Sequence, residues 1–421
     1  MLRNLRPRRE VMATVLVAVT LLVLAACSGA DYPNSTFLPT TDSNRDVTML
    51  WNRMMFWGTI VFVVVEAILV YTMIKYRRRP GGPEPTHVHG NTIMEITWTL
   101  APALILVFLA VPTVRTIFRT QSKAPANAVQ VEVIGHQWWW EFRYPEYGFA
   151  TANELYLPIG RPANFALRTA DVLHSFWIPA LSGKRDLISN RTNYLWFTPD
   201  STGESAFNGS CNEYCGTSHA NMKFRVFTVS PEHFDQWARH QASDAMFPTP
   251  VAPVDSSPTV RPASNTTAAV QPAAAASPVE PWQFPREKIP SYVFPQTPLP
   301  PGMDIPEAVI AAGDAERGFT TYSRSACIGC HKIRGNRSSI GIIGPDLTHV
   351  GSRYTIASGL FVNDALHLSH WIKNARMMKP GTLMQTMGKG MYDPIMKFTI
   401  QAGGLTDAEI ADITAYLLSL K

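Results

Sequence analysis

The hydrophobic pattern divides the chain into five parts. An apolar run at residues 11–24 follows four arginines, and two more, at residues 54–74 and 97–117, are each about long enough to cross a bilayer. Residues 129–229 alternate short β-branched and aromatic segments with turn signals, which predicts a small all-β sandwich or barrel. Residues 248–301 hold 14 of the 33 prolines and predict a semi-rigid linker. Beyond them the spacing becomes helical.

The first apolar run is typical of an export signal, because arginines precede it and small residues follow it. The sequence L24-A-A-C27 resembles the bacterial lipoprotein processing site, at which cleavage leaves Cys27 as a lipidated N-terminus. The alternative is an ordinary secretory signal in which Cys27 is incidental. We therefore predict a signal peptide at residues 1–26, with lipidation of Cys27.

The loop between the second and third apolar runs carries a cluster of basic residues: Lys75, Arg77, Arg78 and Arg79. The positive-inside rule places this loop in the cytoplasm. The two apolar runs then form a multi-pass membrane anchor, and everything after residue 117 faces the periplasmic or outer side of a bacterial inner membrane.

Composition agrees with a partly membrane-embedded chain of 421 residues, with 46% hydrophobic and only 16% charged residues. The net charge of +5 comes with no basic face bearing aromatic residues, so nucleic-acid binding is set aside. The length allows two or three domains. The expected parts are a signal peptide (1–26), an outer-face segment (27–50), a transmembrane hairpin (51–123), a β domain (124–243), a linker (244–301) and an all-α domain (302–421).

The all-α domain contains C327-I-G-C330-H331, the signature for covalent attachment of c-type haem. Cys327 and Cys330 would form thioethers, and His331 would supply the proximal nitrogen. The sequence G344-P-D-L347 follows at the spacing of a haem-packing turn. A final amphipathic helix begins with a capping box, T406-D-A-E409. These features predict a class I cytochrome c domain.

The sixth haem ligand is predicted to be a methionine, which raises the haem potential. The segment K379-P-G-T-L-M384 resembles the class I pattern, so we predict Met384, with Met387 second. The remaining candidates are interpreted mostly as core filler: Met377, Met378, Met391 and Met396. Three histidines are interpreted as exposed surface residues: His349, His367 and His370.

A second cluster of potential ligands lies in the β domain, in C211-N-E-Y-C215-G-T-S-H219-A-N-M222. Two thiolates, an imidazole and a thioether suit copper. A second histidine, His174, precedes Cys211 by 37 residues. The alternatives are a structural zinc site or a disulfide, but zinc rarely takes methionine. With the five cysteines divided among three motifs, none remains for a structural disulfide.

These residues resemble the binuclear copper A site of cytochrome c oxidase subunit II, and the resemblance extends over residues 51–237. It implies a cupredoxin-like β domain and a ligand set of two bridging cysteines, two histidines, a methionine and a backbone carbonyl: Cys211, Cys215, His174, His219, Met222 and Glu213. It also implies that the Glu213 carboxylate binds a magnesium or manganese ion shared with subunit I.

Other positions match the same family. Trp138, in G135-H-Q-W138-W-W140, matches the electron-entry residue, although ordinary packing is the alternative. Glu95 matches a carboxylate at a proton path of subunit I; the alternative is a helix-start acid. Three charged residues correspond to positions near the subunit I boundary: Lys184, Asp186 and Arg191. Glu66, within the first membrane run, is expected to contact subunit I.

The resemblance implies an oxidoreductase: the electron-entry subunit of a proton-pumping terminal oxidase. Electrons would pass from a small external donor through haem c and copper A to haem a in subunit I, where oxygen is reduced to water; subunit III is a further expected partner. The alternatives are a copper A subunit of a nitric oxide reductase, a relative of nitrous oxide reductase, or a copper-storage or delivery module. A quinol oxidase subunit is disfavoured, because that branch lacks the copper ligands.

Overall fold

The computed structural model describes residues 14, 17, 18, 20, 21, 34–37, 39–78, 80–82, 84, 87, 89–200, 203–246 and 282–421. Cys27 and most of the predicted signal peptide lie outside these residues. So do Arg79 and the part of the predicted linker between residues 247 and 281.

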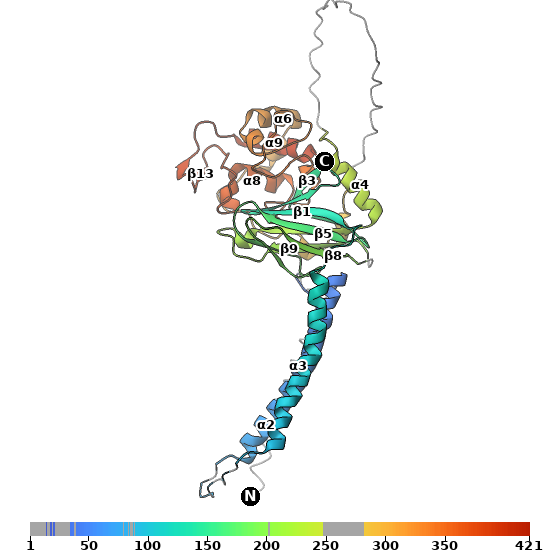
Figure 1. Cartoon of the computed structure of the whole chain (residues 1–421). Helices are drawn as coiled ribbons and strands as arrows, with labels where there is room; N and C mark the ends of the chain where they lie inside the picture. The colour runs from blue at the N-terminus through green and yellow to red at the C-terminus, as the bar shows by residue number, and fades with distance from the viewer. Residues whose placement is uncertain are drawn as a thin grey trace, which may run out of the picture. The chain divides into compact units, whose positions relative to one another are not determined.

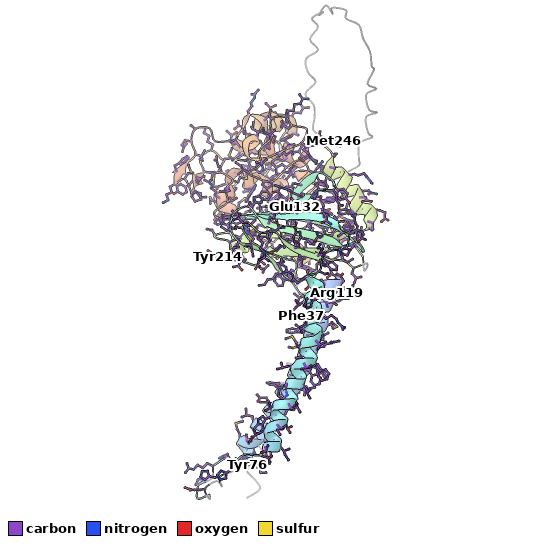
Figure 2. All side chains as sticks on the ribbon, viewed as in Figure 1. Phe37, Tyr76, Arg119, Glu132, Tyr214 and Met246 are labelled. Carbon is purple, nitrogen blue, oxygen red and sulfur yellow. The ribbon has the colours of Figure 1, made fainter. Side chains whose placement is uncertain are left out.

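Two long helices, α2 (Asp42–Lys75) and α3 (Thr92–Thr120), run side by side as a hairpin (Figure 1). Both are long and apolar enough to cross a membrane, and their apolar side chains are largely exposed. Figure 2 shows Tyr76 at one end of the hairpin and Arg119 at the other. The hairpin prediction is therefore confirmed, and an apolar exposed surface of this kind is stable only in lipid.

The first helix begins well before the apolar run that predicts it. The Thr41 side chain accepts from the backbone N–H of Asn44 and caps the helix, so part of the expected outer-face segment is helical. Asn44 donates to the backbone oxygen of Ala180, and Arg119 forms a 2.8 Å ion pair with Asp46. The first contact joins the hairpin to the β domain, and the second joins α2 to α3 within the hairpin.

Two five-stranded sheets form a sandwich, which confirms the predicted all-β, cupredoxin-like domain. The first sheet has the order β3-β2-β1-β5-β8, with β1 (Val129–His136), β2 (Trp139–Tyr144), β3 (Phe149–Ala152), β5 (Ala163–Thr169) and β8 (Asn193–Phe197). The second has the order β4-β10-β9-β6-β7, with β4 (Glu154–Pro158), β6 (His174–Trp177), β7 (Arg185–Leu187), β9 (Ser205–Cys211) and β10 (Lys223–Val229).

Aromatic side chains fill the sandwich core, as the alternating pattern requires. Trp140 and Phe142 from β2 meet Phe176 from β6 and Phe224 from β10, and all four are fully buried. Strand β6 pairs antiparallel with β9, with Phe176 opposite Cys211. This register brings His174 to the loop that follows β9, a contact across 37 residues of chain.

The C-terminal region is mainly helical. It contains α5 (Glu307–Ala311), α6 (Ala315–Arg324), α7 (Cys327–Cys330), α8 (Ala365–Met378) and α9 (Asp407–Ser419). Two small hairpins, which the sequence pattern did not predict, pair β11 (Thr355–Ile356) with β12 (Phe361–Val362) and β13 (Tyr392–Asp393) with β14 (Phe398–Thr399). The predicted capping box is present: Thr406 and Glu409 cap α9 reciprocally.

The predicted linker is wrong at its C-terminal end. Residues 282–301 include two short 3₁₀ turns, η2 (Arg286–Lys288) and η3 (Ser291–Val293), and three of their side chains are buried against the sandwich core: Phe284, Ile289 and Val293. The low-complexity composition ends before Trp282, and the large apolar residues beyond it gain free energy by burial.

Candidate copper and haem sites

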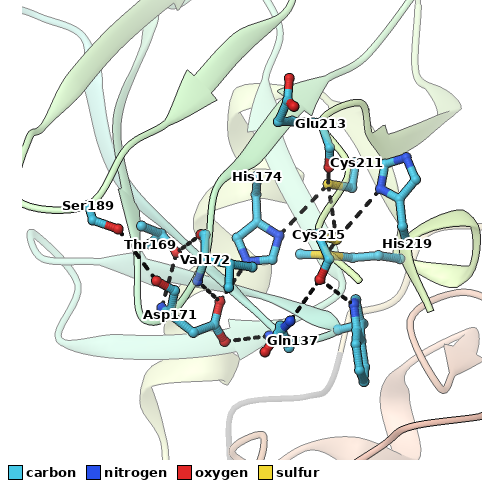
Figure 3. Close-up of polar contacts among 12 residues, drawn as sticks. Gln137, Thr169, Asp171, Val172, His174, Ser189, Cys211, Glu213, Cys215 and His219 are labelled. Carbon is cyan, nitrogen blue, oxygen red and sulfur yellow. Dashed lines mark hydrogen bonds and ion pairs between the residues drawn. The ribbon is translucent and has the colours of Figure 1, made fainter. Parts of the chain in front are cut away.

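The loop after β9 brings two cysteine sulfurs together at one end of the sandwich (Figure 3). The Sγ atoms of Cys211 and Cys215 lie 3.7 Å apart, and both side chains are buried. His174 Nδ1 lies 3.8 Å from the Cys211 sulfur, and His219 Nδ1 lies 3.5 Å from the Cys215 sulfur. Each sulfur thus has one imidazole nitrogen beside it.

Two further donors complete the cluster. The Met222 sulfur lies 3.8 Å from the Cys215 sulfur, and the backbone oxygen of Glu213 lies 3.3 Å from the Cys211 sulfur. Met222 is fully buried, whereas the Glu213 side chain is exposed. All six predicted donors therefore lie together.

Asp171 was not singled out by the sequence, but it supports this cluster. Its carboxylate lies 2.8 Å from His174 Nε2 and also accepts from the backbone N–H groups of Gln137 and Val172. If Nε2 carries the proton and donates it to Asp171, the lone pair of His174 Nδ1 faces the sulfurs. A carboxylate that accepts from a ligand histidine in this way commonly orients the ring at metal sites. Burial raises the pKa of Asp171, but these hydrogen bonds outweigh it and lower the pKa overall.

The paired sulfurs perturb one another. The hydrogen bond from Cys215 lowers the pKa of Cys211 strongly, and the same contact with burial raises the pKa of Cys215. The pair therefore loses its first proton readily, from Cys211, and its last proton reluctantly, from Cys215. Thiolates are the form that binds metals, so two positive centres beside the pair would favour loss of both protons.

The donor set fits a binuclear copper centre. Two adjacent thiolates can bridge two metals, while two imidazoles, one thioether and one carbonyl supply the outer positions. Among the described residues, one cluster of three or more potential side-chain metal ligands is found, and it contains His174, Cys211 and Cys215. A tetrahedral structural zinc site would leave the methionine and the carbonyl unexplained.

Trp138 lies directly against this cluster. Its indole N–H donates to the backbone oxygen of Cys215 at 2.9 Å, and the Gln137 side chain donates to the same oxygen at 2.7 Å. Gly216, with φ of +110°, lets the loop approach the ring: a Cβ there would lie 3.0 Å from Trp138 Cζ2. A hydrogen bond and close packing therefore join the indole to residues 211–222, here called the copper loop.

The C-x-x-C-H segment forms α7, with Cys327 packed against the helical core and Cys330 exposed. His331 Nδ1 donates to the Pro345 oxygen at 2.8 Å, which leaves Nε2 as the free ligand nitrogen. Burial lowers the pKa of His331 and keeps the imidazole neutral. A Cβ on Gly344 would lie 2.5 Å from His331 Cε1, so the turn closes tightly over the ring. The hydrogen bond to Pro345 and the close turn at Gly344 fix the ring of His331 in a way that suits an iron ligand.

The two methionines predicted as the opposite ligand both lie on the segment that follows α8. Met384 is half-buried, and Met387 packs against the helical core. The choice of Met384 stays a prediction.

The prediction of three exposed histidines is wrong: His367 is half-buried, and the other two are buried. His349 and His370 are each 3% exposed. His349 lies between the backbone oxygens of Lys421 and Ser243, and His370 Nδ1 contacts the Leu366 oxygen within α8. Both side chains satisfy buried backbone oxygens, which spacing along the sequence does not reveal.

The other residues expected to face subunit I lie on α2, on α3 and around β7. Glu95 is exposed in the first turn of α3, whose N-cap is Asn91. Glu66 lies within α2. Lys184, Asp186 and Arg191 are exposed around β7.

Sandwich and helical region meet through buried polar groups. The Glu154 carboxylate accepts from the backbone N–H groups of Tyr354 and Thr355 at 2.7 and 2.9 Å. Arg225 donates to the oxygen of Gly359 at 2.8 Å. Burial raises the pKa of Glu154 to about 7 and lowers that of Arg225 to about 10. A buried charge of this kind is tolerated only with such partners.

Fold and sites together define a class of membrane-anchored protein that joins a cupredoxin-like sandwich, with a two-thiolate metal site, to a cytochrome c domain. The family models of the transmembrane and periplasmic domains of cytochrome c oxidase subunit II match residues 37–116 and 148–229, and that of cytochrome c matches residues 315–421. The chain belongs to the cytochrome c oxidase subunit II family, and it is a subunit of an oxidoreductase of the terminal-oxidase type.

Two curated relatives support this assignment. The chain is 36% identical to cytochrome c oxidase subunit 2 of Bacillus subtilis (strain 168), over 97% of both chains. It is 33% identical to that of Alkalihalophilus pseudofirmus, over 77% of each. The solved periplasmic domain of subunit II from Bradyrhizobium japonicum is 29% identical, with 28% of this chain and 96% of that chain covered and a TM-score of 0.27. The matched domains imply copper A and haem c as cofactors and subunit I as a partner in the membrane.

Proposed function

We propose that this chain is the electron-entry subunit of a proton-pumping terminal oxidase. Electrons from an external donor pass first to haem c and then to copper A. From there they continue to haem a in subunit I, where oxygen is reduced to water. With copper bound, the two thiolates would let one electron be shared by both ions, which suits fast electron transfer.

The ligand residues have distinct roles in this relay. Cys211 and Cys215 would supply two thiolates to the copper ions, His174 and His219 would supply one imidazole each, and Met222 and the Glu213 carbonyl would supply the remaining donors. On the haem, Cys327 and Cys330 hold the ring covalently, and His331 and Met384 ligate the iron. Asp171 orients His174 through the hydrogen bond to Nε2.

The contact between Trp138 and the two sites carries the proposal. The indole donates to the Cys215 oxygen, and on its far side it packs against Gly381, three residues before Met384. A single side chain therefore contacts both the copper loop and the loop that supplies the haem ligand. This contact supports transfer from haem c to copper A through Trp138.

The remaining assignments are proposals of the same kind. Glu95 collects protons at the cytoplasmic face, and the Glu213 carboxylate binds a magnesium or manganese ion at the subunit I boundary. The copper and haem domains face the periplasm of a bacterial inner membrane, Cys27 is lipidated, and subunit III completes the complex. The proposed division of the chain is 1–26, 27–50, 51–123, 124–243, 244–301 and 302–421, except that α2 already begins at Asp42 and residues 282–301 pack against the sandwich.

The Cys211→Ser variant of the complete oxidase tests the relay. Loss of one bridging sulfur should abolish the mixed-valence copper signal in electron paramagnetic resonance. Haem c should still be reduced by the donor at the wild-type rate, and reduction of haem a should slow by at least about 100-fold. Rapid-mixing optical spectra measure both steps. Reduction of haem a at the wild-type rate in this variant would disprove the proposed order.

A further inference from the structure

The Cζ3–Cη2 edge of Trp138 is covered by the chain's own cytochrome domain. A Cβ built on Gly381 would lie 2.8 Å from Cζ3 and 2.9 Å from Cη2 of the indole, so only a glycine fits there. Gly381 also has φ of +86°, which other residues rarely adopt. The segment Lys379–Gly381, here called the KPG loop, thus packs directly on the ring.

Lys379 fixes this loop through a buried amino group. The residue is 2% exposed, and Nζ donates to the oxygen of Trp138 at 2.5 Å, to Ser358 Oγ at 2.8 Å and to the oxygen of Ala357 at 3.3 Å. Three acceptors match the three N–H donors of an ammonium group. One of them is the backbone of Trp138 itself, so the lysine links the loop to the residue that the loop covers.

Two further hydrogen bonds join the same surfaces. The hydroxyl of Ser218, which is fully buried in the copper loop, donates to the Pro380 oxygen at 2.5 Å. The hydroxyl of Ser358 donates to the Trp138 oxygen at 2.7 Å. Each residue of the KPG loop therefore has a specific contact: Lys379 and Gly381 with Trp138, and Pro380 with Ser218.

We propose that the KPG loop is the docking element of the cytochrome domain at the electron-entry face of Trp138, and that Lys379 and Gly381 are positioning residues for transfer between the two sites. This inference rests on the proposed relay and deepens it. One electron leaves ferrous haem c and enters copper A; no bond is broken and no proton moves. Because the loop occupies this face, an external donor must deliver its electron to the cytochrome domain instead of to Trp138.

The test uses the complete oxidase with two variants that displace the loop differently. Lys379→Met removes the amino group and keeps the apolar stem, and Gly381→Ala inserts a methyl group against the indole. Two controls are matched to them: Lys397→Met, at an exposed lysine of the same domain, and Gly390→Ala, where φ is +80° and a Cβ meets nothing within 4 Å.

Transfer from haem c to copper A, followed optically after rapid mixing, should slow by at least about tenfold in both variants, since misplacement by 1 Å has large kinetic effects. Reduction of haem c by the donor should stay unchanged, and both controls should match the wild type. Amide hydrogen exchange of the full chain gives a readout independent of electron flow: peptides containing Trp138 and the KPG loop should exchange faster in the variants only.

Wild-type transfer rates and wild-type exchange in Lys379→Met and Gly381→Ala would overturn the inference. If one variant loses its haem or copper spectrum, the other variant decides, because their perturbations are independent. Failure of the relay itself looks different: in the wild type, copper A would then be reduced before haem c or without it.

Discussion

At the residue scale, the metal site depends on an aspartate that binds no metal in the proposed ligand set. Asp171 Oδ1 lies beside His174 Nε2 and accepts from the Val172 N–H, while Oδ2 accepts from the Gln137 N–H. Gln137 in turn donates to the Cys215 oxygen. Asp171 therefore fixes the ring orientation of one ligand and the backbone beside Trp138 at once.

We predict that Asp171→Asn weakens copper binding by about 10-fold to 100-fold, the usual cost of losing a supporting carboxylate. An amide has one acceptor oxygen in place of two, so either His174 or Gln137 loses its partner. Copper retention during titration with a chelator measures the effect. Asp235→Asn, at an exposed position of α4 (Pro231–Ala242), is the control. Equal copper retention in the two variants would contradict this role.

The sequence could point to the six proposed copper ligands because five of them lie within twelve residues, with a donor set that few metals accept. It could not point to Asp171, although Asp171 lies three residues before His174. An aspartate in a turn is common, and its partner atoms become visible only when β6 and the Gln137 backbone are placed side by side. The buried His349 and His370 were missed for the same reason.

At the scale of elements, the cytochrome domain depends on the crossing of α6 and α9. Gly318 on α6 meets the backbone of α9 directly: a Cβ there would lie 2.0 Å from the Asp412 oxygen and 2.8 Å from the Tyr416 Cβ. Arg317 reinforces the crossing by donating to both carboxylate oxygens of Asp412. The two helices approach closely because one of them has no side chain at the contact.

We predict that Gly318→Ala destabilises the cytochrome domain by about 3 kcal/mol or more, because the obstructing atom belongs to the backbone and cannot move aside. Thr320→Ala, at an exposed position on the same helix, should change the stability by less than about 0.5 kcal/mol. Chemical denaturation followed by the haem absorbance measures both. A Gly318→Ala protein as stable as the Thr320→Ala protein would refute the close crossing.

Of the two helices in this crossing, α9 could be predicted at its start from the capping box at Thr406. Their mutual approach could not be predicted, because a glycine in a helical pattern has no unique meaning. The incorrect end of the predicted linker has a comparable cause. Proline content predicted an extended segment, but the side chains of Phe284 and Val293 pack against the apolar core of the sandwich.

At the scale of the whole molecule, two buried charged residues of the sandwich take hydrogen-bond partners from the cytochrome domain. Glu154 is 2% exposed and Arg225 4% exposed, and their partners lie about 200 and 130 residues further along the chain. In the sequence of the sandwich alone, Glu154 and Arg225 look like ordinary positions of β4 and β10. Their pairing depends on the docked arrangement, so no local sequence pattern could have revealed it.

The Glu154 carboxyl makes the docked state depend on pH. Burial raises its pKa from 4.5 to about 7, and the hydrogen bonds from Thr355 and Tyr354 only partly offset that rise. The folded chain then binds more protons than the unfolded chain between these values. Stability from this group is fully present below pH 4.5 and is lost as the pH rises through about 7. Lys379 acts in a different pH range, because burial lowers its pKa from 10.5 to about 7. Between these values the unfolded chain binds more protons, so the contribution of Lys379 to stability rises with pH above about 7.

We therefore predict that the wild type loses up to about 3 kcal/mol of stability as the pH rises from 4.5 to 7, and that Glu154→Gln does not. Glutamine keeps the side-chain oxygen that accepts from Tyr354 and Thr355 but cannot gain or lose a proton. Thermal unfolding of the full chain at several pH values in this range measures the slope. Glu146→Gln, at an exposed ion pair with Arg161, is the matched control and should keep the wild-type slope. A Glu154→Gln chain with the wild-type slope would show that another group carries the pH dependence, and the buried carboxylate would then be a structural contact alone.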